Sequence, residues 1–362
     1  MSTAAVDVTV AIPVRDGGEL LAGTLRALSR QTVAHELLVC DSGSRDGSVA
    51  LARERGARVL EIAPENFSHG GTRNLLMGEA RGARVALLTQ DAEPADERWL
   101  ESLLGGFERA GEVALVFGAY RPRPGASEPV RLELERWFRS LSPDGLPQVE
   151  RLASGERSQL AVELLGRRGF FTDANACVAR AAWERVPFRE VPYAEDRVLA
   201  IDMLRAGYAK VFVPQATVLH SHDYSAGGQL RRSFDEWRGL REVYGWCEPV
   251  SPTHLIGQLR GAVGQARREL IREGATPGAR RAALAAVSRH QLLSLAGAVL
   301  GSRADRLPAA ARRRLSLEGR GSFVPLDLDP SLGLDSPLDL VGGTVPPIDG
   351  ESISPIEDTS GR

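Results

Sequence analysis

Lysine is nearly absent from this chain of 362 residues. Lys210 is the only one, so arginine carries almost all of the positive charge, and the formal net charge is −2. The hydrophobic content of 43% and the charged content of 25% are ordinary for a soluble globular protein. We expect no nucleic-acid partner for this chain.

Cysteine is also scarce, and the residues present, Cys40, Cys177 and Cys247, form no CxxC pair. This spacing argues against a zinc site and a disulfide framework, and it fits a reducing compartment. The first residues contain neither the basic region nor the apolar core of a signal peptide. The apolar stretch at 292–300 is too short to cross a bilayer. We therefore expect a cytoplasmic protein.

The dinucleotide-binding fingerprint GxGxxG is missing after the first expected strand, where Gly17-Gly18 stands alone. Its absence argues against a dehydrogenase. A nucleotide-binding protein without a glycine-rich pyrophosphate loop needs a metal ion and side chains to neutralise the phosphates.

Strand and helix periods alternate over the first 120 residues. Strands are expected at 8–13, 36–40, 58–62, 84–89 and 113–118, and helices at 19–30, 45–55, 69–81 and 97–109. This alternation predicts an α/β fold with a mostly parallel, doubly wound sheet flanked by helices.

The later part of the chain is less regular. Helices are expected at 131–141, 195–205 and 229–246, a loop at 142–148, and strands at 170–178, 210–213 and 217–219. Residues 251–320 are rich in Ala, Leu and Arg and predict two or three further helices, whereas residues 321–362 are acidic and rich in Pro, Gly and Ser. A segment of that composition cannot bury enough apolar surface to fold alone, so we expect a disordered tail.

The end of the fourth expected strand is the most informative place in the chain. The buried run at 84–89 stops at Gln90 and Asp91, just before a turn. A carboxylate there lies at the carboxyl edge of the sheet, where open α/β folds bind ligands. A hard oxygen ligand suits Mg²⁺ or Mn²⁺ holding a diphosphate. The alternative is an Asp that caps the helix starting near Asp96.

Motifs in a fixed order carry a resemblance to a known family. They are AIPVRD at 11–16, CDSGSRDGS at 40–48, FSHGGTRN at 67–74, TQDA at 89–92, YAEDR at 193–197 and VLHSH at 218–222. In their order and spacing, they resemble the family 2 glycosyltransferases, and within these the bacterial rhamnosyltransferase-like branch. The resemblance extends from about residue 8 to about residue 246.

The resemblance implies a GT-A fold, a Rossmann-like single domain, over residues 1–250. Residues 1–120 would bind the nucleotide sugar, and residues 121–250 would provide the acceptor side and the base. Residues 251–320 would form an arginine-rich helical appendage and residues 321–362 the acidic disordered tail.

The implied reaction is an inverting, metal-dependent transfer by direct displacement, with Mg²⁺ or Mn²⁺. The implied donor is a dTDP-linked deoxysugar such as dTDP-L-rhamnose, with UDP- and GDP-sugars left open. The implied acceptor is a cell-envelope glycan or a lipid-linked precursor.

The resemblance also assigns roles to residues of the nucleotide half. The donor would contact Pro13, Val14, Arg15, Asp41, Arg73, Thr89 and Gln90. Asp41 would accept a hydrogen bond from the ring N–H of a pyrimidine, and Asp91 would ligate the metal. Thr89 stands where the family has its first carboxylate, which puts a second carboxylate contact in doubt.

The remaining assignments lie in the second half. Asp196 of the Glu-Asp pair would be the general base, and Glu195 an acceptor contact or a structural partner. His220 and His222 alternate along an extended segment, so we expect only one of them to reach the metal or diphosphate, and we favour His222.

Each assignment has a plainer alternative. Asp41 would instead bond the backbone of its own turn. A carboxylate at a helix start, such as Asp196, is also what the helix dipole favours. Arg73 shares a helix face with His69, and it would pair with the donor or with Asp91.

Two other classes of protein fit some of these residues. A metal-dependent phosphohydrolase would also place Asp91 at a strand end. A non-catalytic nucleotide-sugar-binding module would keep Asp41 and Asp91 and lose the base. The intact pair Glu195 and Asp196 argues against such a module.

The arginine-rich region carries one further expectation. Leu255, Leu259 and Val263 are four residues apart and form an apolar stripe, with arginines at 260, 267, 268 and 272. Either the stripe packs on the catalytic domain, or the region contacts the anionic inner face of a membrane that holds a lipid-linked acceptor. Basic side chains gain about 1 kcal/mol each near such a surface.

Liposome co-sedimentation separates these two alternatives. If the region contacts membranes, a chain ending near residue 320 should pellet with anionic liposomes at least as well as the full chain, because the acidic tail competes for the arginines. A chain ending near residue 246 should pellet less, and rising salt should release all of them. No pelleting of any form at low salt would support the packed stripe.

Overall fold

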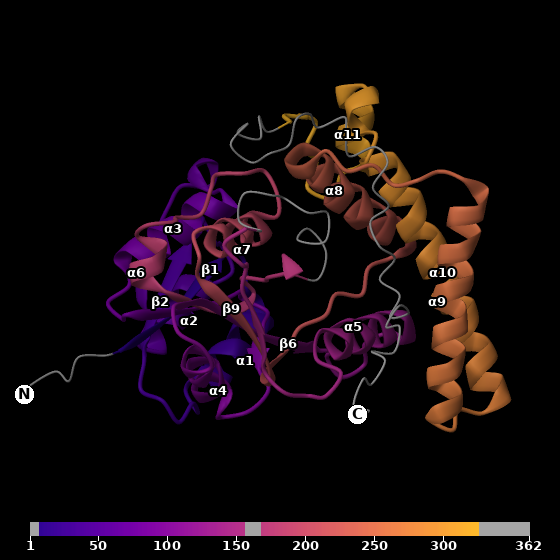
Figure 1. Cartoon of the computed structure of the whole chain (residues 1–362). Helices are drawn as coiled ribbons and strands as arrows, with labels where there is room; N and C mark the ends of the chain where they lie inside the picture. Colours follow the sequence, from indigo (N-terminus) through magenta and orange to yellow (C-terminus); the bar gives the residue numbers. More distant parts are fainter. Residues whose placement is uncertain (1–6, 156–167, 326–362) are drawn as a thin grey trace, which may run out of the picture.

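The computed structural model describes residues 7–155 and 168–325, and they form a nine-stranded sheet with helices on both faces (Figure 1). The strands are β1 (Val8–Val14), β2 (Glu36–Asp41), β3 (Arg58–Glu61), β4 (Arg84–Leu88), β5 (Glu93–Pro94), β6 (Val113–Arg121), β7 (Gln148–Glu150), β8 (Asn175–Ala179) and β9 (Ala209–Leu219). The helices are α1 (Gly18–Leu28), α2 (Ser48–Glu54), α3 (His69–Glu79), α4 (Trp99–Gly105), α5 (Glu128–Leu141), α6 (Arg180–Trp183), α7 (Glu195–Arg205), α8 (Ala226–Tyr244), α9 (Pro252–Arg272), α10 (Pro277–Gly301) and α11 (Ala309–Leu315).

The strand order is β3-β2-β1-β4-β8-β6-β9-β5, and β7 pairs with β9. Strands β3, β2, β1 and β4 are parallel, and β8 runs antiparallel to both β4 and β6. Because β9 is parallel to β6, most of the sheet runs in one direction. The predicted α/β fold with a mostly parallel sheet is therefore confirmed.

The sheet has a hydrophobic core on each face. Val10 and Ile12 of β1 pack with side chains of α1 and α4, whereas the intervening Ala11 faces the core under α3 and α7. This follows from the alternation of side chains along a strand. Burying each large aliphatic side chain contributes about 1.5–3 kcal/mol, which holds the strand ends that carry the site in place.

Three predicted strands differ from the observed ones. Strand β8 begins only at Asn175, because residues 170–174 turn toward the carboxyl edge of β4. The separate strands expected at 210–213 and 217–219 are one strand, β9. Pro214 is tolerated there because the pairing of β9 with β6 shifts register after Gly118, and a bulge needs no ladder hydrogen bond from proline.

The region 251–320 forms the predicted helices, and α10 lies directly on α8 (Figure 1). Glycines allow this close approach: a Cβ at Gly301 would lie 2.3 Å from the carbonyl oxygen of Phe234, and one at Gly297 would lie 2.4 Å from that of Leu230. The expected tail lies outside the described residues from 326 onward.

The apolar stripe of α9 is partly buried, and Val263 packs against a small cluster that contains Leu132 and Ala266. The arginines at 260, 267, 268 and 272 are exposed. Within the described ranges, α10 is the one helix whose length and composition would allow it to cross a membrane, and 22% of its apolar window is buried. Membrane contact stays a prediction.

Candidate active site

The carboxyl ends of β1, β2 and β4 meet at one edge of the sheet, and a side-chain amide ties two of them together. Gln90, just after β4, accepts a hydrogen bond from the Arg15 amide at 2.9 Å and donates to the Arg15 carbonyl at 3.1 Å. The Thr89 carbonyl accepts a bond from the amide of Ala92, which closes the turn around Asp91. Gln90 thus fixes the spacing of β1 and β4.

Asp41 ends β2 opposite Val14, which puts the expected donor residues Pro13, Val14 and Arg15 beside it. Its Oδ1 accepts hydrogen bonds from the amides of Gly43 and Ser44, both at 2.9 Å, and its Oδ2 accepts one from the Ser44 hydroxyl. The side chain is buried, and these hydrogen bonds are the ones expected if Asp41 bonds the backbone of its own turn. The favoured contact of Asp41 with the base stays a prediction.

Asp91 faces both histidines of the VLHSH motif. His222 Nε2 lies 3.3 Å from Asp91 Oδ2, and His220 Nδ1 lies 3.6 Å from Asp91 Oδ1. One ligand atom from each residue fits within a 4.8 Å span. The expectation that only one histidine reaches the site is wrong, because β9 ends at Leu219 and strand alternation no longer applies beyond it. These contacts support a metal site over the alternative in which Asp91 caps the helix that starts near Asp96.

The charges of this cluster suit metal binding. Burial alone would raise the pKa of Asp91. The positive charge that His220 carries when it is protonated, at low pH, holds the pKa of Asp91 below its ordinary value. Burial lowers the pKa of His220, so this imidazole is neutral at neutral pH and keeps a lone pair for a ligand. The carboxylate and the two imidazoles together are a common donor set for a divalent cation.

A second cluster holds three carboxyl groups. Glu195 and Asp196 begin α7, and Asp173 precedes β8. Burial, and then the charge of Asp173, raises the pKa of Glu195 to about 8 and that of Asp196 well above its ordinary value. The His69 ring also lies here, with Nδ1 3.9 Å from Glu195 Oε1. The cluster therefore retains protons that isolated carboxyls would release.

Arg73 belongs to this second cluster and not to the first. Its Nε lies 2.7 Å from Asp173 Oδ2, its Nη1 donates to the Leu88 carbonyl at 3.0 Å, and its side chain is only 4% exposed. Of the two partners considered for Arg73, Asp91 is therefore excluded, and contact with the donor stays a prediction, although the guanidinium has little exposed surface. Arg73 instead joins α3 to the end of β4 and to Asp173.

Tyr120 connects the two clusters. Its ring centroid lies 4.8 Å from that of His220, and its hydroxyl is hydrogen-bonded to the Thr172 hydroxyl, next to Asp173. Burial raises the pKa of Tyr120, and the charges of Asp196, Asp173 and Asp91 raise it further.

A cavity of about 320 Å³ adjoins His220 and His222. Tyr120 and Trp137 line it from the sheet and α5, Arg232 from α8 and His290 from α10. Its volume is that of a small-molecule site.

Comparison with known proteins identifies the family. The chain is 32% identical over 234 residues to the O-antigen chain rhamnosyltransferase RfbN of Salmonella typhimurium, covering 63% of this chain and 70% of that protein. The family model "Glycosyl transferase family 2" matches residues 9–166. The chain belongs to glycosyltransferase family 2. It is 30% identical to the O-antigen chain rhamnosyltransferase WbaN of Salmonella anatum, covering 59% of this chain and 67% of that protein.

Among solved structures, this glycosyltransferase is similar to the mannosyltransferase PcManGT of Pyrobaculum calidifontis in complex with GDP-Man and Mn²⁺, at 20% identity and a TM-score of 0.47. That similarity covers 85% of this chain and 79% of the other. The family model spans Asp41 and Asp91, whereas Glu195 and both histidines of the VLHSH motif follow its last matched residue. The GT-A fold expected for the family agrees with the observed sheet.

Sequence reasoning missed Asp173 and Tyr120, which only the folded sheet brings to the site. It also missed Lys210 in β9, although a single lysine within an apolar run was a signal. Lys210 is buried and donates to the carbonyls of Arg168 and Phe170, just before Asp173. Burial lowers its pKa to about 7.

The raised pKa of Glu195 predicts a pH-dependent gain in stability for Glu195→Gln. Between its ordinary value of 4.5 and about 8, the folded chain holds a proton that the unfolded chain has lost, so this group makes folding less favourable as pH rises. Denaturant unfolding of both proteins should show a difference in unfolding free energy that grows in favour of the variant from about pH 5 to about pH 8. A difference that does not change with pH would contradict the buried carboxyl.

Proposed function

We propose that this glycosyltransferase moves a sugar, with L-rhamnose as the candidate, from a nucleotide-sugar donor to a hydroxyl of a cell-envelope glycan or lipid-linked acceptor, with inversion and with a divalent metal. The observation that carries the proposal is the position of Tyr120 between the Asp91 cluster and the carboxyl cluster. The donor phosphates would lie at the Asp91 cluster, and the acceptor hydroxyl would meet a base in the carboxyl cluster, within one site.

Asp91, His220 and His222 would hold the metal. Two imidazoles beside one carboxylate favour Mn²⁺ over Mg²⁺, because Mg²⁺ takes oxygen ligands almost exclusively. When bound, the metal would offset the charge that develops on the leaving diphosphate. The neutral state of His220 supports its role as a ligand.

The donor nucleotide would lie along the edge formed by Pro13, Val14 and Arg15 of β1 and by Gln90 after β4. Gln90 would act by fixing the Arg15 backbone, since both its amide atoms are bonded there. The rhamnosyltransferase names of RfbN and WbaN support rhamnose as the sugar, and dTDP-L-rhamnose is the candidate donor.

Asp196 would take the proton from the acceptor hydroxyl as its oxygen attacks the anomeric carbon and the bond to the nucleotide phosphate breaks. Asp196 would act in its ionised form, which a raised pKa makes a stronger base once its proton has left. Glu195 would share the proton or bind the acceptor, and Arg73 would hold Asp173 in place.

The acceptor sugar would occupy the 320 Å³ cavity beside the histidines. Trp137 offers it an apolar ring surface, and Arg232 offers hydrogen-bond donors. His290 of α10 also lines the cavity, so the arginine-rich region would take part in acceptor binding.

The phosphohydrolase and the non-catalytic module are less well supported. Family membership favours glycosyl transfer over simple phosphate hydrolysis. A module without a base would not need three neighbouring carboxyl groups, two of them buried, which are costly to keep together. The cytoplasmic location and contact with the inner membrane face stay predictions.

Asp91→Ala should abolish transfer and the Mn²⁺-dependent part of nucleotide affinity, because it removes the carboxylate of the metal cluster. Titration calorimetry with dTDP, UDP and GDP, with and without Mn²⁺, measures this and also identifies the nucleotide. Asp305→Ala, which removes a carboxylate paired with Arg241, is the matched control. Undiminished Mn²⁺-dependent binding in Asp91→Ala would remove the metal assignment.

Asp196→Asn should bind the donor nucleotide almost normally and lose turnover by roughly 10²–10⁴-fold, the usual contribution of general-base assistance. Steady-state kinetics beside calorimetry measures both quantities. If Asp196→Asn retained turnover and Glu195→Gln lost it, the base would be Glu195.

A further inference from the structure

The loop that leads into α7 has an unfavourable backbone conformation. Ala194, directly before Glu195, has φ 58° and ψ 33°, in the left-handed region that a residue with a Cβ seldom adopts, and its side chain gives the helix no cap. Such a conformation persists only where the surrounding structure holds it. Whatever holds this loop therefore also sets the positions of Glu195 and Asp196.

Helix α8 holds one side of the loop. The Tyr193 ring lies so close to Gly239 that a Cβ there would come within 2.3 Å of the tyrosine side chain. The Tyr193 hydroxyl accepts a hydrogen bond from Arg232 Nη1 at 2.9 Å. Arg232 also lines the acceptor cavity, so this contact joins the cavity wall to the loop.

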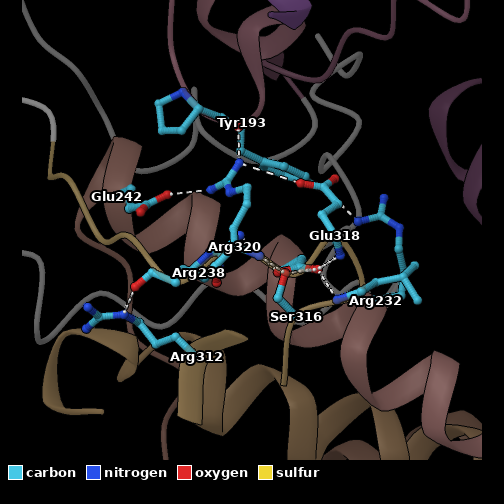
Figure 2. Close-up of polar contacts among 12 residues, drawn as sticks. Tyr193, Arg232, Arg238, Glu242, Arg312, Ser316, Glu318 and Arg320 are labelled. Atoms are coloured by element: carbon cyan, nitrogen blue, oxygen red, sulfur yellow. Dashed lines mark hydrogen bonds and ion pairs between the residues drawn. The ribbon is translucent and has the colours of Figure 1, made fainter. Parts of the chain in front are cut away.

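A segment far along the chain holds the other side. Residues 316–324, which follow α11 and are called the strap below, contact successive turns of α8, and Arg320 reaches the loop (Figure 2). Arg320 Nη1 donates to the Pro192 carbonyl at 2.7 Å, and Arg320 Nη2 lies 3.2 Å from Glu242 Oε2. The guanidinium thus joins the loop to α8 through two different partners.

Buried charges of α8 anchor the strap. Arg238 Nη1 donates to the Arg320 carbonyl at 2.9 Å, and Asp235 Oδ2 accepts bonds from the Ser316 hydroxyl at 3.1 Å and the Leu317 amide at 2.6 Å (Figure 2). The side chains of Asp235, Arg238 and Glu242 are 4%, 1% and 1% exposed. Charges this deeply buried are costly without partners. Asp235 and Arg238 pair with each other at 2.9 Å, and the strap supplies the further partners of these charges and of Glu242, so α8 and the strap stabilise each other.

The strap also lies close enough to the carboxyl cluster to affect it electrostatically. After burial and Asp173, the charge of Glu318 contributes to the raised pKa of Glu195. The strap begins well beyond residue 166, the last residue that the family model matches. It is therefore a feature of this chain outside the matched core of the family.

We propose that the strap positions the catalytic carboxyl pair, and that Arg320 is the positioning residue through which it does so. Arg320 acts through the Pro192 carbonyl: by fixing the start of the loop, it keeps Ala194 strained and Glu195 and Asp196 turned into the site. The inference rests on the proposed role of this pair as the base.

Hydrogen exchange of the resting full-length protein tests the positioning directly. Arg320→Gln should speed amide exchange at residues 193–198 and leave β1 and β4 unchanged, because only the loop loses its partner. Arg303→Gln is the matched control, since Arg303 also donates from its guanidinium to a loop carbonyl, that of Glu248, at 2.9 Å. It should not change exchange at residues 193–198.

Kinetics provides the second readout. Arg320→Gln should lower kcat roughly 10- to 100-fold, the scale expected for a displaced catalytic group, with Mn²⁺-dependent nucleotide affinity unchanged. Arg320→Lys should recover part of this loss, because an ammonium group still donates to the Pro192 carbonyl. If Arg320→Gln fails to fold, Ser316→Ala, which removes one anchor to Asp235, should produce the same effects in milder form.

The outcomes separate the two proposals. Unchanged exchange at residues 193–198 in Arg320→Gln, or equal effects in Arg303→Gln, would overturn the positioning role. A different result would be faster exchange at residues 193–198 in Arg320→Gln while Asp196→Asn keeps full turnover. Arg320 would then still hold the loop, and the assignment of Asp196 as the base would be removed instead.

Discussion

The ion pair between Arg73 and Asp173 is the interaction on which the site depends. It joins α3 to the carboxyl end of β4 and to the residues before β8, which are far apart in the sequence. The positive charge of Arg73 beside Asp173 partly offsets the rise in the pKa of Glu195, as that of Arg197 does for Asp196, so both carboxyls can lie close to a third. Without these charges, mutual repulsion and burial would drive the carboxyl groups apart or keep them all protonated.

The sequence predicts the nucleotide half better than the acceptor half, for a physical reason. Strands such as β1 and β4 are local apolar runs, and Asp91 follows one of them, so periodicity alone places it at the sheet edge. The Arg73 partner depends on side chains brought together by folding, and Asp173 was not among the partners considered for it. The two histidines also depart from expectation, because alternation stops where β9 ends.

The second half relies on pairing across long distances in the chain. Glycines of α10 permit direct helix contact with α8, and α8 in turn carries buried charges that pair with each other and with residues 316–324. No local pattern reveals such an arrangement, since isolated arginines and acids look like a solvated helix face. The arginine-rich region thereby becomes part of the wall of the site, and its description as an appendage understates its role.

Lys210 gives this protein a built-in marker. Its Nζ is the chain's single side-chain amine, and it lies inside the wall formed by β9 and residues 168–170. A reagent that acylates amines reaches residue 210 only when that wall opens. Acylation at this one position therefore reports how often the segment leading to Asp173 moves away from β9, with no probe added to the chain.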